Sequence, residues 1–535
     1  MEVLSWMPWL APLILLLVFK GFYSRPLRRK LNVPPGPRPW PIIGNLDLMG
    51  SLPHRSIQHL SMKYGPLMQL KFGSQPLVVA SSAEMAKQVL KTYDLSLSDR
   101  PRTAAGVLTT YNCSGMVWSL YTPYWRQVRK IWSTELFNPR RLESFEYIRV
   151  EETRALINGL FLLSGKELKL KDHLADTNMN VISRIAFGKK YLDDDDKKSS
   201  NDQSSVSDDG LDILDYQNKK SGSVVSAKEF RSMLDEIFLL NGVLNIGDWI
   251  PWLGFLDLQG YEKRMRVVSE KFDRLLEHVI DEHKERKLLS SSDWAPEDMV
   301  DLLLEIAEDP SLEVKLTRSS IKAQALELMG GGTESSTVTL EWAISELMKK
   351  SKILKKAQEE LDKVIGKERW VEEKDMQNLP YIQAITKETM RMHPVAPLLV
   401  PRVARKDLKI SDYDIPVGTQ VRVNVWAIGR DPVSWNEPNE FRPERFVDKA
   451  VDVKGQHFEL LPFGAGRRMC PGYLLGLKVI QSTLANLIHG FEWKLGGGMS
   501  EEGLDMEEIF GLSTPRKLPL NVIVEPRLPT HLYVK

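Results

Sequence analysis

Apolar residues recur every three or four positions over most of the chain, and this period predicts helices rather than strands. Residues 67–80 predict two short strands around the turn Gly73-Ser74-Gln75-Pro76, and residues 417–425 predict a third. The sequence therefore predicts a mainly α fold with minor β sheets. The helical period is clearest in seven segments, which we expect to be helices: 125–136, 228–240, 261–283, 321–349, 352–365, 381–392 and 473–489.

The N-terminal residues 3–19 carry no charged side chain and as a helix would span about 25 Å, close to the thickness of a bilayer core. The basic residues that follow predict a lumenal N-terminus and a cytosolic body. We therefore expect residues 1–20 to be a single-pass signal anchor in the endoplasmic reticulum membrane. A cleaved signal peptide is the alternative, but no basic residue precedes the apolar run and no small-residue cleavage site follows it.

A basic and proline-rich segment connects this anchor to the body of the protein. Residues 34–41 contain five prolines, which forbid helix and favour stiff polyproline II. We expect residues 21–45 to act as a hinge. Farther along, residues 193–226 are rich in Asp, Ser, Lys and Gly, and because they lack calcium-loop spacing we expect a solvated loop.

Composition excludes several classes of protein. The chain has 535 residues, of which 42% are hydrophobic and 27% charged, as is typical of a globular protein. Its formal net charge of +1 gives no overall attraction for nucleic acid. The two cysteines, Cys113 and Cys470, exclude a disulfide-rich scaffold and a zinc site built on paired CxxC motifs.

Cys470 stands in the glycine-rich stretch 463–472, just before a predicted helix. The positive end of the helix dipole and its unpaired N–H groups favour a thiolate, which binds metals or attacks carbon. A free thiol in a glycine-rich turn is the alternative if this stretch is taken alone.

Three other sequence features contain candidate functional residues. Glu388 and Arg391 lie three residues apart on a predicted helix and can form an ion pair. Trp125 and Arg129 lie one turn apart, a pair suited to binding carboxylates. Each pair alone is compatible with ordinary surface charge.

The third feature is a run of glycines at 330–332 inside a predicted helix, followed by Glu334 and Ser335. Each glycine costs about 1 kcal/mol relative to alanine, so the run indicates close packing, a kink or the approach of a ligand. Glu334 beside hydroxyl groups suggests a proton path, and a helix–helix contact with an outward Glu334 is the alternative.

These features, in this order and with the FRPERF stretch at 441–446, make the chain similar to plant A-type microsomal cytochromes P-450, which are haem-thiolate monooxygenases. The likeness implies one cytochrome P-450 fold domain over residues 46–535. It implies haem b (iron protoporphyrin IX) as cofactor, with Cys470 as the axial thiolate and metal ligand. It also implies cofactor-binding roles for Trp125, Arg129, Arg402, Phe463 and Arg468, and a structural triad of Glu388, Arg391 and Arg445.

By the same likeness, Gly331 and Gly332 distort the helix to make room for dioxygen, and Glu334 and Ser335 are catalytic residues that deliver protons. Ser335 departs from the family's usual Thr and lacks the β-methyl group that restricts χ1. We expect a largely apolar pocket without an inward cationic cluster for a fatty-acid or phosphate head group. Its expected lining is Leu326, Met329, Ala396, Leu398, Leu399, Leu512 and Ser513.

The implied reaction inserts one oxygen atom of O₂ into a small apolar substrate. The chain shows no flavin or dinucleotide module, so a separate NADPH-cytochrome P-450 reductase is the expected partner. It would dock on basic residues that include Arg126, Lys130, Arg140, Arg141 and Arg467.

We expect a phenylpropanoid-derived substrate such as a lignan or flavonoid. A terpenoid oxidase or an oxidative C–C cleaving enzyme is the alternative within the fold. A haem-thiolate isomerase or dehydratase that dispenses with hydroxylation, and a non-catalytic membrane haem protein, are further alternatives.

Overall fold

The computed structural model describes residues 31–190, 225–290, 294–447 and 449–534. The predicted anchor and nearly all of the predicted loop at 193–226 lie outside these ranges. Among the helices within them, none combines the length and apolar character needed to cross a membrane.

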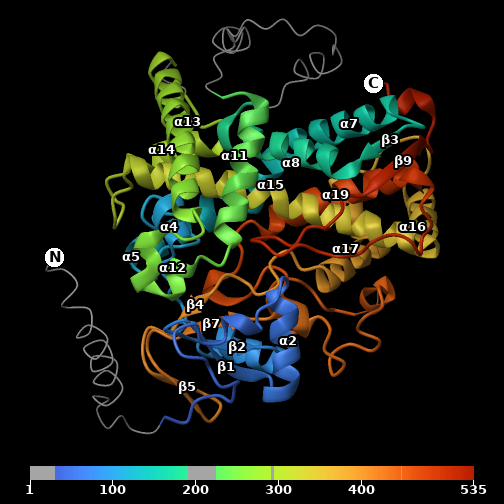
Figure 1. The fold of residues 1–535 in the computed structure, drawn as a ribbon. Coiled ribbons are helices and arrows are strands. Elements are labelled where there is room, and N and C mark those ends of the chain that lie inside the picture. The colour runs from blue at the N-terminus through green and yellow to red at the C-terminus, as the bar shows by residue number, and fades with distance from the viewer. Residues whose placement is uncertain (1–30, 191–224, 291–293, 448, 535) are drawn as a thin grey trace, which may run out of the picture.

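Helices dominate the described chain (Figure 1). All seven predicted helices are present with small shifts at their ends, and segment 125–136 is an α-helix that continues as a π-helical turn, Trp132–Leu136. Two long helices, α7 and α8, were not predicted. The α-helices are α2 (Pro53–Tyr64), α3 (Ala83–Lys87), α4 (Ala104–Thr109), α5 (Pro123–Ile131), α6 (Pro139–Ser144), α7 (Glu146–Leu162), α8 (Leu170–Phe187), α11 (Ala227–Gly242), α12 (Ile246–Trp249), α13 (Tyr261–Leu289), α14 (Met299–Ala307), α15 (Arg318–Lys349), α16 (Ser351–Val364), α17 (Pro380–Met392), α18 (Val425–Ile428) and α19 (Tyr473–Gly490).

The strands form three small sheets. The largest has the order β1-β2-β7-β4, with β2 and β7 parallel and the other pairs antiparallel. A second has the order β3-β9-β8, and β5 pairs with β6. The three predicted strands correspond to β1, β2 and β7. The strands are β1 (Leu67–Phe72), β2 (Gln75–Ala80), β3 (Glu167–Lys169), β4 (Arg402–Val403), β5 (Leu408–Ile410), β6 (Tyr413–Ile415), β7 (Gln420–Val423), β8 (Phe491–Leu495) and β9 (Asn521–Pro526).

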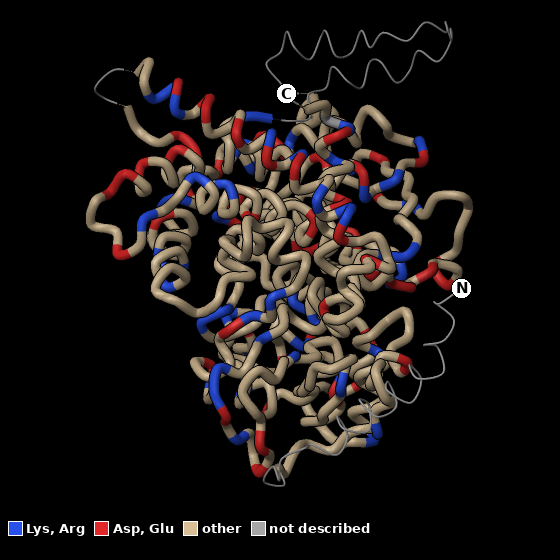
Figure 2. The backbone as a smooth tube through the Cα atoms, turned by 60° about the vertical axis from the view of Figure 1, so that its left-hand side comes forward, with Lys and Arg blue, Asp and Glu red and all other residues tan. Residues whose placement is uncertain are grey.

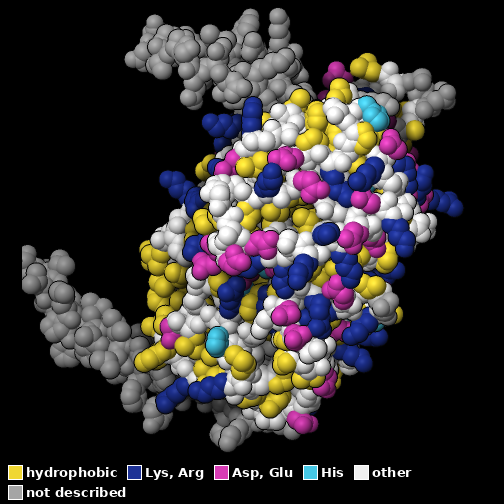
Figure 3. Space-filling view, turned by 90° about the vertical axis from the view of Figure 1, so that its right-hand side faces the viewer, with side chains coloured by type: hydrophobic (Ala, Val, Ile, Leu, Met, Phe, Trp, Pro, Cys, Tyr) yellow, Lys and Arg dark blue, Asp and Glu magenta, His cyan; other side chains and the backbone are white. Residues whose placement is uncertain are grey.

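The four-stranded sheet and α2 lie at one end of the molecule, and α7, α8, α11, α13 and α14 lie at the other (Figure 1). Helix α15 runs between them. Its N-terminus is capped by Thr317, whose hydroxyl oxygen accepts the backbone N–H of Ser320 at 3.2 Å. Acidic and basic residues are distributed along the described trace (Figure 2), and side chains of both signs mix on the face shown by space filling (Figure 3), as expected from the net charge of +1.

The three glycines of α15 do not interrupt the helix, which remains α-helical from Arg318 to Lys349. The expected distortion is therefore not present. A Cβ on Gly332 would lie 2.4 Å from Cδ1 of Ile182 on α8, so this glycine allows the two helices to pack closely. A Cβ on Gly330 or Gly331 would meet nothing within 4 Å, because both residues border open space.

The predicted ion pair between Glu388 and Arg391 is present and completely buried. Nε and Nη2 of Arg391 donate to the Glu388 carboxylate at 2.7 and 2.8 Å. Arg445, from the turn Pro443–Phe446, donates its Nε–H to the same carboxylate at 3.2 Å. The backbone N–H of Arg442 adds a fourth hydrogen bond at 2.7 Å, so the buried charges are fully coordinated.

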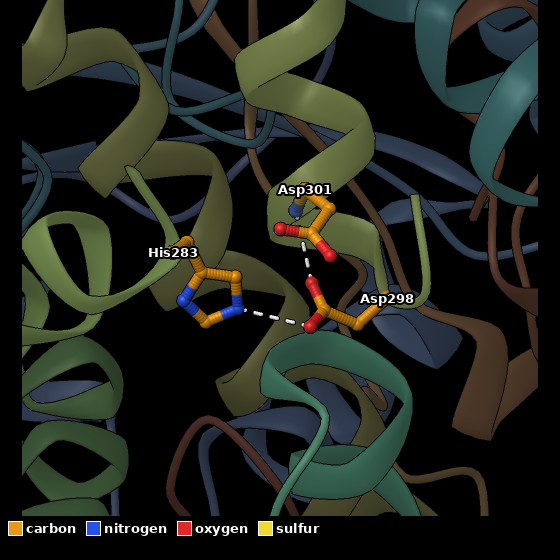
Figure 4. Close-up of side chains that lie close together, drawn as sticks. All are labelled: His283, Asp298 and Asp301. Carbon is orange, nitrogen blue, oxygen red and sulfur yellow. Dashed lines mark hydrogen bonds and ion pairs between the residues drawn. The ribbon is translucent and has the colours of Figure 1, made fainter. Parts of the chain in front are cut away.

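A second buried ionic cluster joins the C-terminal part of α13 to the start of α14 (Figure 4). His283 Nε2 lies 2.9 Å from Oδ2 of Asp298. The other carboxylate oxygen of Asp298, Oδ1, accepts the backbone N–H of Asp301 and so caps α14. The His283, Asp298 and Asp301 ligand atoms lie within 4.8 Å of one another, but Arg286 already pairs with both carboxylates. The cluster is therefore an ion network that holds two helices together.

His283 carries its charge in this network. Its Nδ1 lies 2.6 Å from the Val279 carbonyl oxygen, so both ring nitrogens face acceptors and both must be protonated to donate. Burial disfavours the charged ring, but the hydrogen bond and negative charge of Asp298 outweigh this and raise the pKa of His283.

Replacing Glu388 by Gln should lower the free energy of unfolding by about 3–5 kcal/mol, because two buried arginines lose their counter-charge. Thermal or denaturant unfolding of the haem-loaded protein measures this loss. Glu359→Gln, at an exposed position on α16, is the matched control and should change stability by less than about 0.5 kcal/mol. Equal effects of the two variants would contradict a central role for the Glu388 network.

His283→Gln should destabilise the protein more at about pH 6 than at about pH 9. Because the folded-state pKa is raised, the stabilisation is complete below the unfolded-state pKa and is lost as pH rises through the folded-state pKa. Unfolding curves of both proteins at the two pH values test this. His59→Gln, at an exposed position on α2, is the control and should change stability by less than about 0.5 kcal/mol at either pH. An effect of His283→Gln that grows with pH would refute the assignment.

Candidate active site

Cys470 lies in the loop that precedes α19, two residues before the N-cap Gly472. Its backbone N–H donates to the Phe463 carbonyl oxygen at 3.0 Å, which closes the loop on itself. Within the loop, Gly466 has a φ of +72°, and a Cβ there would lie 2.2 Å from the carbonyl oxygen of Leu90. Only glycine fits this position, so the loop is held tightly against the residues that follow α3.

The Cys470 side chain is exposed although it lies deep in the protein, because it faces a cavity. Burial raises the pKa of the Cys470 thiol, while the Gly472 N–H and the positive charge of Arg129 act in the opposite direction. The Gly472 N–H at the helix N-terminus thus favours the thiolate, as expected, but burial outweighs it. A metal cation bound to the sulfur would remove its proton.

The cavity at Cys470, here called the inner cavity, has a volume of about 320 Å³. The residues predicted to bind a cofactor come from three separate parts of the chain and meet around it. They are Trp125, Arg129, Arg402, Phe463, Arg468 and Cys470. Arg100, which the sequence analysis missed, also lines it.

The inner cavity thus has four arginines in its wall. Nη1 of Arg402 donates to Oδ1 of Asp94 at 2.6 Å. For Arg100, Arg129 and Arg468, the hydrogen bonds found among the described residues go to backbone carbonyl oxygens. Positive charge therefore exceeds paired negative charge around the cavity.

The electrostatics agree with this excess. Burial, followed by repulsion from Arg402, lowers the pKa of Arg468 to about 9. Burial, followed by repulsion from Arg468 and Arg402, also lowers the pKa of Arg100. The site would therefore bind a ligand with two negative groups, and such a ligand would relieve the repulsion.

These residues fit the haem b that the sequence resemblance implies. Cys470 would hold the iron, and the four arginines would hold the two carboxylates. When bound, haem supplies the iron that activates O₂.

Two aromatic residues help to shape this wall. Nε1 of Trp125 donates to the Met116 carbonyl oxygen at 2.9 Å, and the Arg468 guanidinium lies 4.2 Å from the centroid of the indole. Trp125 thus positions Arg468 by stacking, and its N–H is not directed at a carboxylate as we had expected. The Phe463 ring borders the cavity beside Cys470 and lies 6.2 Å from the ring of Tyr473.

The predicted proton-delivery residues, Glu334 and Ser335, lie on α15. Ser335 lines the inner cavity, and its hydroxyl donates to the Gly331 carbonyl oxygen at 3.0 Å. Glu334 reaches the cavity through Ser513, whose Oγ lies 2.8 Å from Oε1 of Glu334. Burial raises the pKa of Glu334, which favours its protonated form.

An outer cavity of about 250 Å³ adjoins the inner one. The two share Gly331, Ala396, Leu399 and Leu512 in their walls, so a ligand can extend from one into the other. Of the predicted pocket residues, the outer cavity is lined by Leu326, Ala396, Leu398, Leu399 and Leu512.

Met329 does not line either cavity within the described parts of the chain, contrary to our expectation. It is 1% exposed and packs in the helical core. At about 100° of rotation per residue, it lies on the side of α15 almost opposite Glu327.

Glu327 lines the outer cavity and was missed by the sequence analysis. Its carboxylate accepts the backbone N–H of Val117 at 3.0 Å, and a Cβ on Gly115 would lie 2.0 Å from it. Burial raises the pKa of Glu327 to about 7. A lone acidic residue in the otherwise apolar run at 325–329 was the signal that could have found it.

Comparison with known proteins agrees with this geometry. The family model described as "Cytochrome P450" matches residues 34–520. A trimethyltridecatetraene synthase from Zea mays is 46% identical over 98% of this chain and 94% of its own length. A flavonoid 3′-monooxygenase from Petunia hybrida is 41% identical over the full length of both chains.

Solved structures give the same assignment. A zebrafish cytochrome P450 bound to progesterone is similar with a TM-score of 0.71 and 27% identity, over 89% of this chain and all of its own. Members of the family are monooxygenases that hold haem iron on a Cys thiolate and receive electrons from a reductase. This chain belongs to the cytochrome P450 family.

Proposed function

We propose that this enzyme uses O₂ and NADPH-derived electrons to insert one oxygen atom into an apolar plant specialised metabolite of phenylpropanoid origin. The observation that carries the proposal is the Cys470 sulfur facing a cavity with four arginines in its wall, which adjoins an outer cavity lined largely by apolar side chains. The likeness to flavonoid 3′-monooxygenases from Petunia hybrida and Arabidopsis thaliana, at 41% and 39% identity, supports this substrate class.

A terpenoid substrate is the second candidate. Two relatives from Zea mays, at 46% and 44% identity, are synthases named for methyl-branched polyenes, trimethyltridecatetraene and dimethylnonatriene. Those names describe hydrocarbons without oxygen, so an oxygenase that makes one loses the inserted oxygen either as water or with a cleaved carbon fragment. In the latter case the same pocket would carry out oxidative C–C cleavage.

The side chains have separate tasks in this reaction. Cys470 holds the iron, and Arg100, Arg129, Arg402 and Arg468 fix the orientation of the haem carboxylates. A proton held on the Glu334 carboxyl would pass through the Ser513 hydroxyl, 2.8 Å away, into the inner cavity. The Ser335 hydroxyl, on the same cavity wall, would orient a water molecule or O₂ for this transfer.

We infer that residues 1–20 anchor the enzyme in the endoplasmic reticulum membrane with the N-terminus in the lumen. Residues 21–45 would be the hinge and residues 46–535 the cytosolic catalytic domain. Large apolar side chains in the hinge and in the segment before α13 support a membrane-facing surface, because Trp40, Ile42, Trp252 and Phe255 are each more than half exposed. Residues beside both segments, Leu46 and Leu253, pack on one hydrophobic cluster.

Electrons would come from a membrane-bound NADPH-cytochrome P-450 reductase. Arg467, in the Cys470 loop, is exposed, as are Arg126, Lys130 and Arg140. These cations offer a docking surface for an acidic partner, and raised ionic strength should weaken such a contact.

Membranes that contain this chain and a plant reductase should add the mass of one oxygen atom to a lignan, flavonoid or terpene alcohol when NADPH is supplied. Mass spectrometry of the products measures this. Cys470→Ala should abolish the product and the Soret band typical of a thiolate-bound carbonyl complex. Cys113→Ala, which removes a buried thiol that lines neither cavity in the described parts of the chain, should retain both. Turnover by Cys470→Ala would refute the proposal.

Ser335→Ala should raise the hydrogen peroxide released per NADPH consumed by at least about twofold, because dioxygen is protonated less accurately. The effect should stay below the about 100-fold typical of losing a general acid, since Glu334 and Ser513 remain. Peroxide and NADPH assays with a turnover substrate measure it. Ser319→Ala, at an exposed position near the start of α15, is the control. Unchanged coupling in Ser335→Ala would remove Ser335 from the mechanism.

A further inference from the structure

Arg422 of strand β7 occupies an unusual position for a cation. Its strand neighbours Val421 and Val423 face the inner cavity and are 1% and 2% exposed. Because side chains alternate along a strand, Arg422 points to the opposite face of the sheet. It pairs in register with Val79, which belongs to an apolar cluster with Trp249 and Leu398.

The Arg422 guanidinium lacks a partner within the described ranges. Its Nε is fully buried and makes no hydrogen bond, and no ion pair of this side chain is found there. Burial alone, without a contribution from a described charged residue, lowers the pKa of Arg422 to about 10. The guanidinium makes a cation–π contact with the ring of Trp249, whose centroid lies 5.9 Å from Cζ of Arg422.

Arg422 lines the outer cavity. Gln420 lies on the same face of β7 and borders the same cavity, as does Asn245, whose buried Nδ2 also has no partner. Three groups able to donate hydrogen bonds therefore surround one space. The other charged residues in its wall are Arg102, Asp248 and Glu327, and burial raises the pKa of both acids, to about 6 and about 7.

We propose that Arg422 binds a carboxylate at one end of the substrate, with the apolar body extending past Ala396, Leu399 and Leu512 into the inner cavity. The substrate is then an organic acid, and the oxidised carbon lies at the end remote from its carboxylate. We expected no inward cationic cluster for an acidic head group, and Arg422 is a single cation rather than a cluster. Arg422 is distinct from the arginines of the inner cavity because the backbone of β7 separates them.

This assignment narrows the substrate class of the proposed function. It rests on that function in one respect, which is that the substrate enters through the outer cavity. The test is therefore a binding measurement without turnover. Full-length, haem-loaded protein in phosphatidylcholine nanodiscs is titrated calorimetrically at about pH 8, where carboxyl groups are ionised. The probes are two matched pairs, cinnamic acid with cinnamyl alcohol and geranic acid with geraniol, and empty nanodiscs are the reference.

In at least one pair the acid should bind more tightly than the alcohol. Arg422→Gln should weaken binding of that acid by about 10-fold to 100-fold, the range for a hydrogen-bonded charged group, and change the alcohol's Kd by less than about twofold. Arg422→Lys keeps the charge and should keep the preference for the acid. Lys71→Gln, an exposed cation on the same sheet, should leave both affinities unchanged.

Retention of the carbonyl complex in each variant shows that it is folded and loaded. The proposal is overturned if neither acid binds more tightly than its alcohol, or if Arg422→Gln weakens acid and alcohol equally. It is also overturned if phosphatidylserine in the nanodisc abolishes the preference, because the site would then belong to a lipid head group. An absence of monooxygenase activity with this binding intact would instead contradict the proposed function alone.

Discussion

Unpaired positive charge around a buried sulfur is the constraint on which this structure depends. Burial and then repulsion from Arg402 lower the pKa of Arg468, and burial and then repulsion from Arg468 and Arg402 lower that of Arg100. Asp94 accepts from Arg402 and also from the backbone N–H of Arg467, so it is shared between two arginines. A buried ion without a counter-charge costs several kcal/mol, so an anionic ligand in the inner cavity would stabilise its wall. Binding of haem and stability of the fold are therefore coupled in this protein.

In the buried triad of Glu388, Arg391 and Arg445, by contrast, the charged groups are paired within the protein. There one carboxylate accepts four hydrogen bonds, and the remaining donors of Arg391 and Arg445 reach backbone carbonyl oxygens. Nothing in that network is left for a ligand. The comparison separates two uses of buried arginine in one fold: a completed network holds elements together, and an incomplete one marks a place where a ligand supplies the missing charge.

Sequence periodicity found the helices whose buried face is apolar, and it missed those whose buried face is mixed. On α7 the buried positions include Arg149 and Glu152, and on α8 they include Asn178 and Ser183. Polar residues at core positions break the apolar repeat from which helices are predicted. Arg100 was missed for a related reason, because it follows Ser98 and Asp99 in a polar stretch where burial has no sequence signal. The inner-cavity residues were found because they lie in motifs whose order and spacing are specific.

Strand β7 shows why the outer cavity was harder to predict than the inner one. The sequence Val421-Arg422-Val423 has the alternation of a strand with one face in water, and under that interpretation a cation on the second face needs no partner. In the structure Trp249, at the end of α12, covers this second face, which places Arg422 in an enclosed space. The valines of β7 border the inner cavity that holds the Cys470 sulfur, while Arg422 borders the outer cavity. A change at Arg422 can therefore alter which substrate binds without altering how the haem binds, because the backbone of β7 separates Arg422 from the inner cavity.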